Sequence, residues 1–289
     1  MRFRGHLTAA SFPILMEVSQ FMQRVSSSDM CFVVLNEERM SFAMKTSGED
    51  VQTFVHLNIA KVFGDVVIES RADNNIAFAL GIANFSRALQ SGKEASGIML
   101  RLLKRDGRSF LSLRARTVDL DIIQNIPIEV VSMATAESYR EPNIPPPTVA
   151  LEMPPLRALR TITDRLKAMQ KFLLVQAGMD GTLRLRVQSD TIVLQTLHTN
   201  LRCRPDLADD PTSKDGEEAD GYNVDETNNF AASSVRVDAR HASKMLSVDG
   251  NAVLTVLCCL VDQQALVVHA VLVDGFGSFT CYVPVVAMH

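Results

Sequence analysis

Residues 125–155 read NIPIEVVSMATAESYREPNIPPPTVALEMPP and lie near the middle of a chain of 289 residues. An apolar run at 126–133 gives way to a polar stretch that contains Pro142 and the triple proline 145–147, and a second apolar run starts at Thr148. Consecutive prolines fix φ and remove backbone donors, so 145–147 should be extended and lie outside any sheet. The stretch predicts a connector at 131–147 between a first domain, 1–130, and a second domain, 148–289, and two domains suit this length.

The order of predicted elements is the same in the two halves. Each half carries four apolar residues at spacings of 3, 4 and 3, which is the pattern of a helix with one buried face. The second set follows the first by 144 residues: Leu15, Val18, Met22 and Val25, then Leu159, Ile162, Leu166 and Met169. Towards the end the offset becomes 157, since Ile126-Pro127-Ile128 falls on Val283-Pro284-Val285. We therefore expect an α+β fold of two duplicated domains, each with two helices on antiparallel sheet.

The change of offset places an insertion in the second copy at 205–229. This segment has nine acidic residues and one lysine, whereas the whole chain has a net charge of -4. Gly, Pro and Asn are common there and large apolar residues are few, so we expect a solvated loop. An acidic binding segment is the alternative interpretation.

The predicted helices place basic residues on the faces opposite their apolar stripes. Such a pattern suits electrostatic contact with a phosphate backbone, and base-stacking aromatics are absent among these positions. Ordinary solvated helix faces are the alternative. The residues are Arg24, Arg87, Arg157, Arg160, Lys167, Lys171, Arg240 and Lys244.

Motifs of catalysis are absent from the sequence. It contains no phosphate-binding GxxxxGKS loop, GxGxxG, HExxH or GxSxG, and its six histidines are scattered. The five cysteines have no CxxC spacing, and adjacent Cys258 and Cys259 would point to opposite faces of a strand, so we expect small buried residues rather than a metal site. We expect no catalytic residue, cofactor, metal or membrane span, and an intracellular protein.

Five stretches resemble, in order, the sliding-clamp superfamily that includes PCNA. Within it they most resemble the Hus family of the nine-one-one DNA-damage checkpoint clamp. They are MRFRGHL (1–7), FSRAL (85–89), NIPIEVV (125–131), LLVQAGMDGTLRLRV (173–187) and YVPV (282–285).

This resemblance implies a non-catalytic, nuclear subunit of a heterotrimeric ring around duplex DNA. Its helices would line the channel, which makes the eight basic residues above the channel candidates. Its partners would be two other PCNA-like subunits, a clamp loader, and repair and signalling proteins. Subunits of this superfamily join by pairing edge strands, which by position implicates 110–116 and, at the other edge, 192–197. The interface candidates are Phe110, Leu111, Leu113, Ile192, Leu194 and Leu197.

Two other functions remain open at this point. A homotrimeric replication processivity clamp has the same fold, and a scaffold with duplicated domains that does not bind DNA would show the same repeat. The proline-rich connector differs from that of PCNA, so the PCNA peptide pocket is not carried over to this chain.

Overall fold

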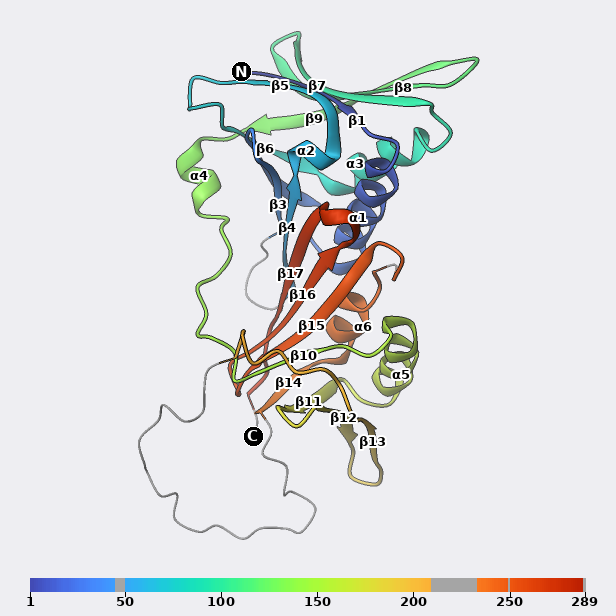
Figure 1. Cartoon of the computed structure of the whole chain (residues 1–289), viewed down its shortest axis with the longest axis vertical. Coiled ribbons are helices and arrows are strands. Elements are labelled where there is room, and N and C mark those ends of the chain that lie inside the picture. The colour runs from blue at the N-terminus through green and yellow to red at the C-terminus, as the bar shows by residue number, and fades with distance from the viewer. Residues whose placement is uncertain (45–49, 209–232, 249, 288–289) are drawn as a thin grey trace. The chain divides into compact units, whose positions relative to one another are not determined.

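The computed structural model describes residues 1–44, 50–208, 233–248 and 250–287 (Figure 1). It divides into two compact units. The first unit comprises Met1–Pro142, Ser247–Leu254 and Ala270–Cys281, and the second comprises Asn143–Leu246, Thr255–His269 and Tyr282–His289. The division at 142 falls inside the predicted connector, and segments late in the sequence complete the first unit. Of the predicted acidic insertion, only 205–208 lies among the described residues.

The first unit is built on an antiparallel sheet with strand order β17-β4-β3-β2-β6-β9-β8-β7-β1-β5. Its helices are α1 (Ser11–Val25), α2 (Ile59–Val62), α3 (Ile82–Ser91) and α4 (Met133–Glu137). Its strands are β1 (Arg2–Leu7), β2 (Met30–Leu35), β3 (Arg39–Met44), β4 (Gln52–Asn58), β5 (Phe63–Glu69), β6 (Ile76–Gly81), β7 (Gly97–Arg105), β8 (Arg108–Arg116), β9 (Asp121–Val130) and β17 (Gly277–Val283), the last of which ends in the second unit.

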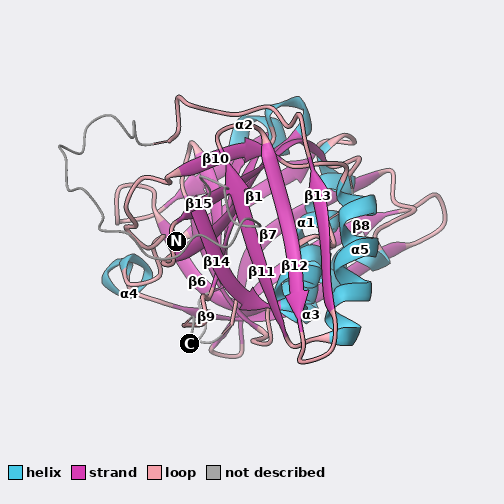
Figure 2. Ribbon diagram, turned by 90° about the horizontal axis from the view of Figure 1, so that it is seen from below, coloured by secondary structure: helices cyan, strands magenta, loops and turns pink. Residues whose placement is uncertain are grey.

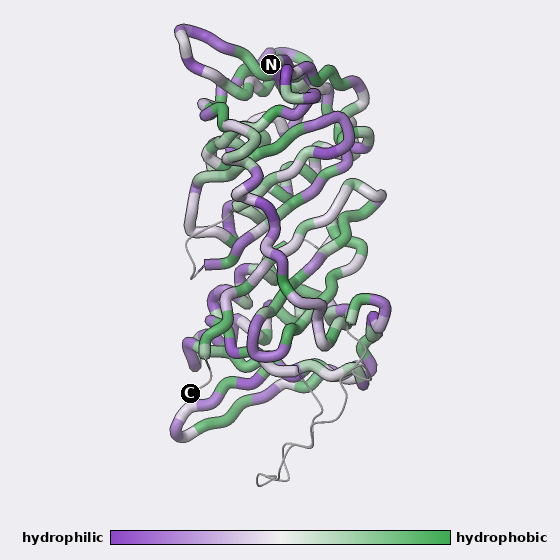
Figure 3. The backbone as a smooth tube through the Cα atoms, turned by 90° about the vertical axis from the view of Figure 1, so that its left-hand side faces the viewer, coloured by the Kyte–Doolittle hydropathy of each residue, from purple (hydrophilic) through white to green (hydrophobic). Residues whose placement is uncertain are grey.

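Apolar and polar residues alternate along these strands, so one face of each strand packs on the core. In β2, Cys31, Val33 and Leu35 are buried, whereas the residues between them are more exposed. Figure 3 shows the backbone changing repeatedly between hydrophobic and hydrophilic along the strands. The turn into β3 is closed by the Asn36 side chain, which accepts hydrogen bonds from the backbone of Glu38 and Arg39. Strands β2 and β3 thus form a hairpin.

Helices α1 and α3 pack against each other over the core of the first unit. All four residues of the predicted α1 stripe are buried, as are Ile82, Phe85 and Leu89 of α3. Phe21 of α1 contacts Phe279 of β17, with ring centroids 4.6 Å apart. A residue near the end of the chain therefore completes the core of the first unit.

The second unit combines a four-stranded sheet with three further strands. Its sheet has the order β13-β12-β11-β14, whereas β10, β15 and β16 are consecutive strands of the larger sheet. The strands are β10 (Val149–Glu152), β11 (Phe172–Gly178), β12 (Thr182–Gln188), β13 (Val193–His198), β14 (Ser233–Asp238), β15 (Val253–Val261) and β16 (Ala265–Leu272); β15 and β16 also contribute residues to the first unit. Helices α5 (Leu156–Met169) and α6 (Ala239–Met245) contact each other, and α5 runs beside β12 and β13 in Figure 2.

The buried face of α5 differs from the predicted stripe. Leu159 and Leu166 are buried as expected, but Met169 is 47% exposed, and Leu156 and Thr163 complete the buried face. Thr163 can be buried because its hydroxyl donates to the carbonyl of Leu159 at 2.9 Å. The outward face of α5 is consequently rotated by about 60° from the prediction.

The expectation that 110–116 forms a sheet edge is wrong. These residues belong to β8, which pairs with β7 along its whole length and with β9 from Ser109 to Arg116. Leu111 and Leu113 are fully buried, and Phe110 is partly buried. The nearest unpaired edge belongs to the next strand, β9, because only its residues 128–130 pair with β6, while the sheet itself ends at β5.

Candidate nucleic-acid interface

Helix α5 brings two of the predicted basic residues beside one carboxylate, and α6 adds a hydroxyl group to the cluster. Asp164 accepts hydrogen bonds from Lys167 Nζ at 2.6 Å and from the Ser243 hydroxyl, and Arg160 Nε lies 3.9 Å away. Lys167 also donates to Ser243 Oγ at 2.9 Å, which links α5 to α6. The hydrogen bond from Lys167, and then that from Ser243, hold the pKa of Asp164 below its ordinary value. Asp164 therefore offsets part of the positive charge of this group.

The outward face of α5 carries two further arginines, Arg157 and Arg165. Both side chains are exposed, and neither makes an ion pair with another described residue. Arg157 was predicted and Arg165 was missed, because the rotation of the helix moves Arg165 onto the outward face and turns Arg160 to its flank. Only the burial of Leu156 and Thr163, which the structure shows, reveals this rotation.

The remaining predicted cations of the second unit lie on α6 or just after α5. Arg240 is exposed on the first turn of α6, where Asp238 caps the helix by accepting from the Arg240 backbone N–H. Lys244 is half-buried on the same helix. Lys171 follows α5, with its Nζ 5.1 Å from the centroid of the Phe172 ring.

The two predicted cations of the first unit have different environments. Arg24, in the last turn of α1, donates to Glu17 Oε1 at 2.7 Å and to the backbone carbonyl of Ser247 at 3.1 Å. These contacts fix its guanidinium within the first unit. Arg87 is exposed on α3 and makes no ion pair with another described residue. Arg87 is therefore the better placed of the two to meet an external phosphate.

Each unit also presents an unpaired strand edge with exposed apolar residues. On β9 the edge extends from Asp121 to Pro127 and includes Ile123, which is 55% exposed. On β13, which pairs with β12 and ends the four-stranded sheet, Leu194 and Leu197 are exposed, as is Ile192 just before the strand. Unpaired edges are the sites at which strands of another chain can add.

The fold has a close counterpart among solved structures. A PCNA from Thermococcus kodakaraensis aligns with 98% of this chain and 100% of its own, with a TM-score of 0.70 and 14% sequence identity. A likeness at this identity shows the fold, which is PCNA-like. The family model for Hus1-like proteins matches residues 1–287. The chain belongs to the Hus1-like family.

Curated relatives agree with this assignment. Checkpoint protein hus1 of Schizosaccharomyces pombe is 26% identical over 97% of this chain and 96% of its own length. The checkpoint protein hus1 homolog of Dictyostelium discoideum is also 26% identical, over 99% of this chain and 98% of its own. Checkpoint protein HUS1 of Homo sapiens is 22% identical over 74% of this chain and 79% of its own.

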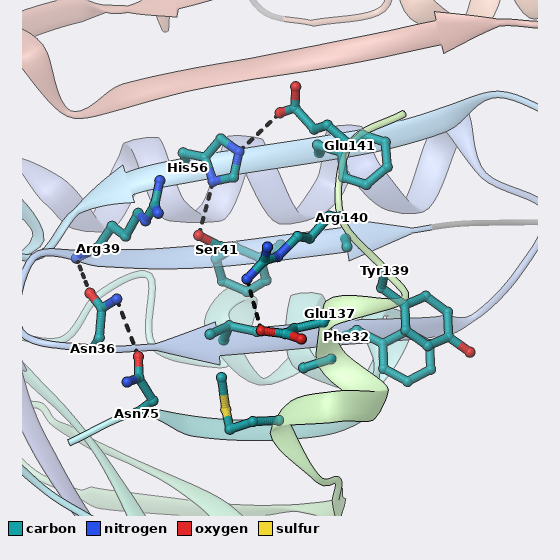
Figure 4. A pocket seen from close by; sticks show the side chains of 16 residues that line it. Phe32, Asn36, Arg39, Ser41, His56, Asn75, Glu137, Tyr139, Arg140 and Glu141 are labelled. Atoms are coloured by element: carbon teal, nitrogen blue, oxygen red, sulfur yellow. Dashed lines mark hydrogen bonds and ion pairs between the residues drawn. The ribbon is translucent and has the colours of Figure 1, made fainter. Parts of the chain in front are cut away.

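In this Hus1-like chain the connector packs against the face of the first unit's sheet that is opposite to α1 and α3. Tyr139 stacks on Phe32 of β2 with ring centroids 3.5 Å apart. His56 of β4 lies between Ser41 Oγ and Glu141 Oε1, at 2.9 Å from each (Figure 4). Beside these contacts is a pocket of about 550 Å³, bounded by α4 and by strands β2–β4. The connector is thus a packed element at 133–141, with extended backbone after it.

The described part of this Hus1-like chain contains neither a group of metal-ligating side chains nor a membrane-spanning helix. Among those residues, no three His, Cys, Asp or Glu side chains are grouped so that they could hold a metal ion. No helix within the same residues is long and apolar enough to cross a membrane.

Proposed function

We propose that this chain is a non-catalytic subunit of a heterotrimeric, PCNA-like checkpoint clamp that encircles duplex DNA. The membership of the Hus1-like family and the checkpoint names of its relatives support this function. In this proposal the ring acts in the nucleus, is placed on DNA by a clamp loader, and serves as a platform for signalling and repair proteins. A homotrimeric replication clamp is less well supported, because these relatives are named as checkpoint proteins.

The observation that carries the proposal is the outward basic face of α5. Arg157 and Arg165 lie on the side of the helix that faces away from its own sheet, and no described acid pairs with them. Exposed guanidinium groups without an acidic partner attract phosphates and do not read the base sequence. Arg87 on α3 and Arg240 on α6 present the same chemistry, so all four are proposed channel residues.

The two strand edges supply the proposed means of ring closure. The edge of β9 at 121–127 would pair with a strand of one neighbour, and the edge of β13 would pair with a strand of the other. Main-chain hydrogen bonds would give affinity, and exposed residues such as Ile123 and Leu197 would give specificity. Because the two edges of one chain differ, each subunit would pair head to tail with the next. Three subunits joined in this way would close a ring.

Light scattering of the purified chain, alone and with two other PCNA-like subunits, tests the assembly. We expect one copy of each chain in a ring, whereas a homotrimer of this chain alone would overturn the heterotrimer. Retention of the ring on circular duplex DNA tests the channel, with the pair R157Q and R165Q as the variant. The pair R71Q and R108Q is the matched control, because it also removes two exposed positive charges, from the turn between β5 and β6 and from the start of β8. Retention that is equal in wild type and the double variant would contradict the channel assignment.

A further inference from the structure

A second basic surface lies on the face of the four-stranded sheet that is turned away from α5 and α6. The strand register places Arg236 of β14 and Arg186 of β12 on either side of Leu174 of β11, because Leu174 is paired with both. Paired residues share a sheet face, so the two arginines project from the same side. Their Cα atoms are about 10 Å apart, which is two strand spacings.

The helices pack on the opposite face. Leu173, Leu185 and Ala242 line a small gap between the sheet and α5 and α6, and these two leucines alternate along their strands with Leu174 and Arg186. The surface that carries Arg186 and Arg236 is therefore separate from the proposed DNA-binding face of the same unit.

Arg186 and Arg236 border a pocket of about 620 Å³. The pocket is also lined by two glutamines, a serine, two apolar residues of β11 and one acid: Gln170, Gln188, Ser189, Phe172, Leu174 and Asp190. Amide and hydroxyl groups can donate hydrogen bonds there in addition to the guanidinium groups. The two arginines outweigh the single carboxylate, so the pocket has a positive balance.

Both guanidinium groups are held in place by uncharged neighbours. Arg186 Nη2 donates to Gln188 Oε1 at 2.9 Å, while its Nε is buried and has no hydrogen-bond acceptor. Arg236 lies over the ring of Phe172, with Cζ 4.5 Å from the centroid. Neither arginine forms an ion pair with another described residue. Two half-buried cations with unused donors in one pocket are suited to a ligand that brings its own negative charge.

We propose that this pocket binds a phosphorylated serine or threonine side chain of a partner protein. A phosphate dianion has three acceptor oxygens and enough charge to match two arginines, each of which can bind it bidentately. A carboxylate would satisfy one arginine and leave the other without an anion. Nucleic acid is the less suitable ligand, because the Phe172 ring that could stack on a base is already covered by Arg236.

Fluorescence anisotropy with a labelled peptide tests the proposal. The probe is a short glycine-rich peptide with one central phosphoserine, compared with the same peptide carrying serine, and both are titrated with the full chain. We expect binding of the phosphopeptide, weakened about tenfold or more by R186Q or by R236Q. R186K should bind more weakly than wild type but better than R186Q, because lysine keeps the charge and loses the planar fork.

Arg71→Gln is the matched control, since it removes one exposed arginine from the turn between β5 and β6 in the first unit. Equal weakening by R71Q, or equal affinity for the unphosphorylated peptide, would overturn the proposal, as would the absence of binding. A single-stranded oligonucleotide that displaced the peptide and bound more tightly would assign the pocket to nucleic acid instead. Thermal unfolding of each variant checks that the fold is retained. These outcomes do not test the proposed clamp function, which depends on the outward faces of the helices and on the strand edges.

Discussion

Lys167 Nζ lies 2.6 Å from Asp164 Oδ1, so a channel candidate predicted from the sequence is held by a carboxylate of its own helix. The two residues are three positions apart on α5, where side chains are neighbours. The same carboxylate lies 3.9 Å from Arg160 Nε. Asp164 therefore lowers the net positive charge of the proposed channel face, and it also orients the side chains that remain there.

Replacement of Asp164 by asparagine should raise the affinity of the assembled ring for duplex DNA. The variant keeps the shape of the side chain and removes one negative charge beside Arg160 and Lys167, so retention should increase a few-fold at low salt and converge with wild type at high salt. Filter binding across a salt series measures this. Asp119→Asn, which removes an exposed acid between β8 and β9, is the matched control. If the two variants had the same effect, the local role of Asp164 would be refuted.

The lowered pKa of Asp164 predicts a contribution to acid stability. A carboxylate with a lower pKa in the folded state favours folding above its ordinary pKa, and this contribution is lost as pH falls through the lowered value. D164N should therefore lose less stability than wild type between neutral pH and about pH 3. Thermal unfolding at a series of pH values tests this. Parallel losses in both proteins would show that Asp164 does not contribute.

Ile123→Lys should prevent ring assembly without unfolding the chain. Ile123 is 55% exposed on the unpaired edge of β9, where a charge is tolerated in the monomer and opposes burial against a neighbouring strand. Size-exclusion chromatography with light scattering measures assembly with the two partner subunits. Leu254→Lys is the control, because Leu254 is 71% exposed elsewhere in the first unit. Normal assembly of I123K would remove β9 from the proposed interface.

Gly277→Ala should destabilise the first unit strongly. Gly277 begins β17 with φ of 143°, and a Cβ atom there would overlap the carbonyl oxygen of His56 in β4. We expect a loss of about 3 kcal/mol or more in the free energy of unfolding, measured by chemical denaturation. Gly97→Ala serves as control, because Gly97 has open space around its Cα and no unusual φ. A G277A variant as stable as G97A would contradict this packing.

Alkylation should distinguish one cysteine from the other four. Burial raises the pKa of Cys259 to about 11 and that of Cys281 to about 12, and it raises those of Cys31 and Cys258 as well. These thiols stay protonated and covered near pH 8, whereas Cys203 is partly exposed. Iodoacetamide followed by peptide mass spectrometry should modify Cys203 first and the others only after unfolding. Rapid modification of Cys258 in the native protein would contradict the described core.

The sequence predicted elements well where large apolar residues repeat at one period. The α1 stripe was correct because Leu15, Val18, Met22 and Val25 all face the core. The α5 stripe was misplaced because Thr163, a polar residue, is buried with its hydroxyl satisfied inside the helix, while Met169 is exposed. Local periodicity cannot show that a hydroxyl has found its acceptor.

The order of strands within a sheet was harder to predict. Alternation in 108–116 is compatible with an edge or an interior strand, and only the pairing of β8 with both β7 and β9 decides between them. The pocket around Arg186 and Arg236 was missed for a related reason. These residues are 50 positions apart, and the register of β11 with its two neighbours brings them to one face.

The participation of β17 in the first unit means that the duplicated halves of the sequence are not independent modules. Phe279 packs on Phe21, and Cys281 lies 3.7 Å from the hydroxyl of Thr53, which is 228 positions earlier in the sequence. A nonsense mutation just before codon 277 would remove β17 and leave that core open. During synthesis, the amino-terminal half must wait for residues 277–281 before it can complete its packing.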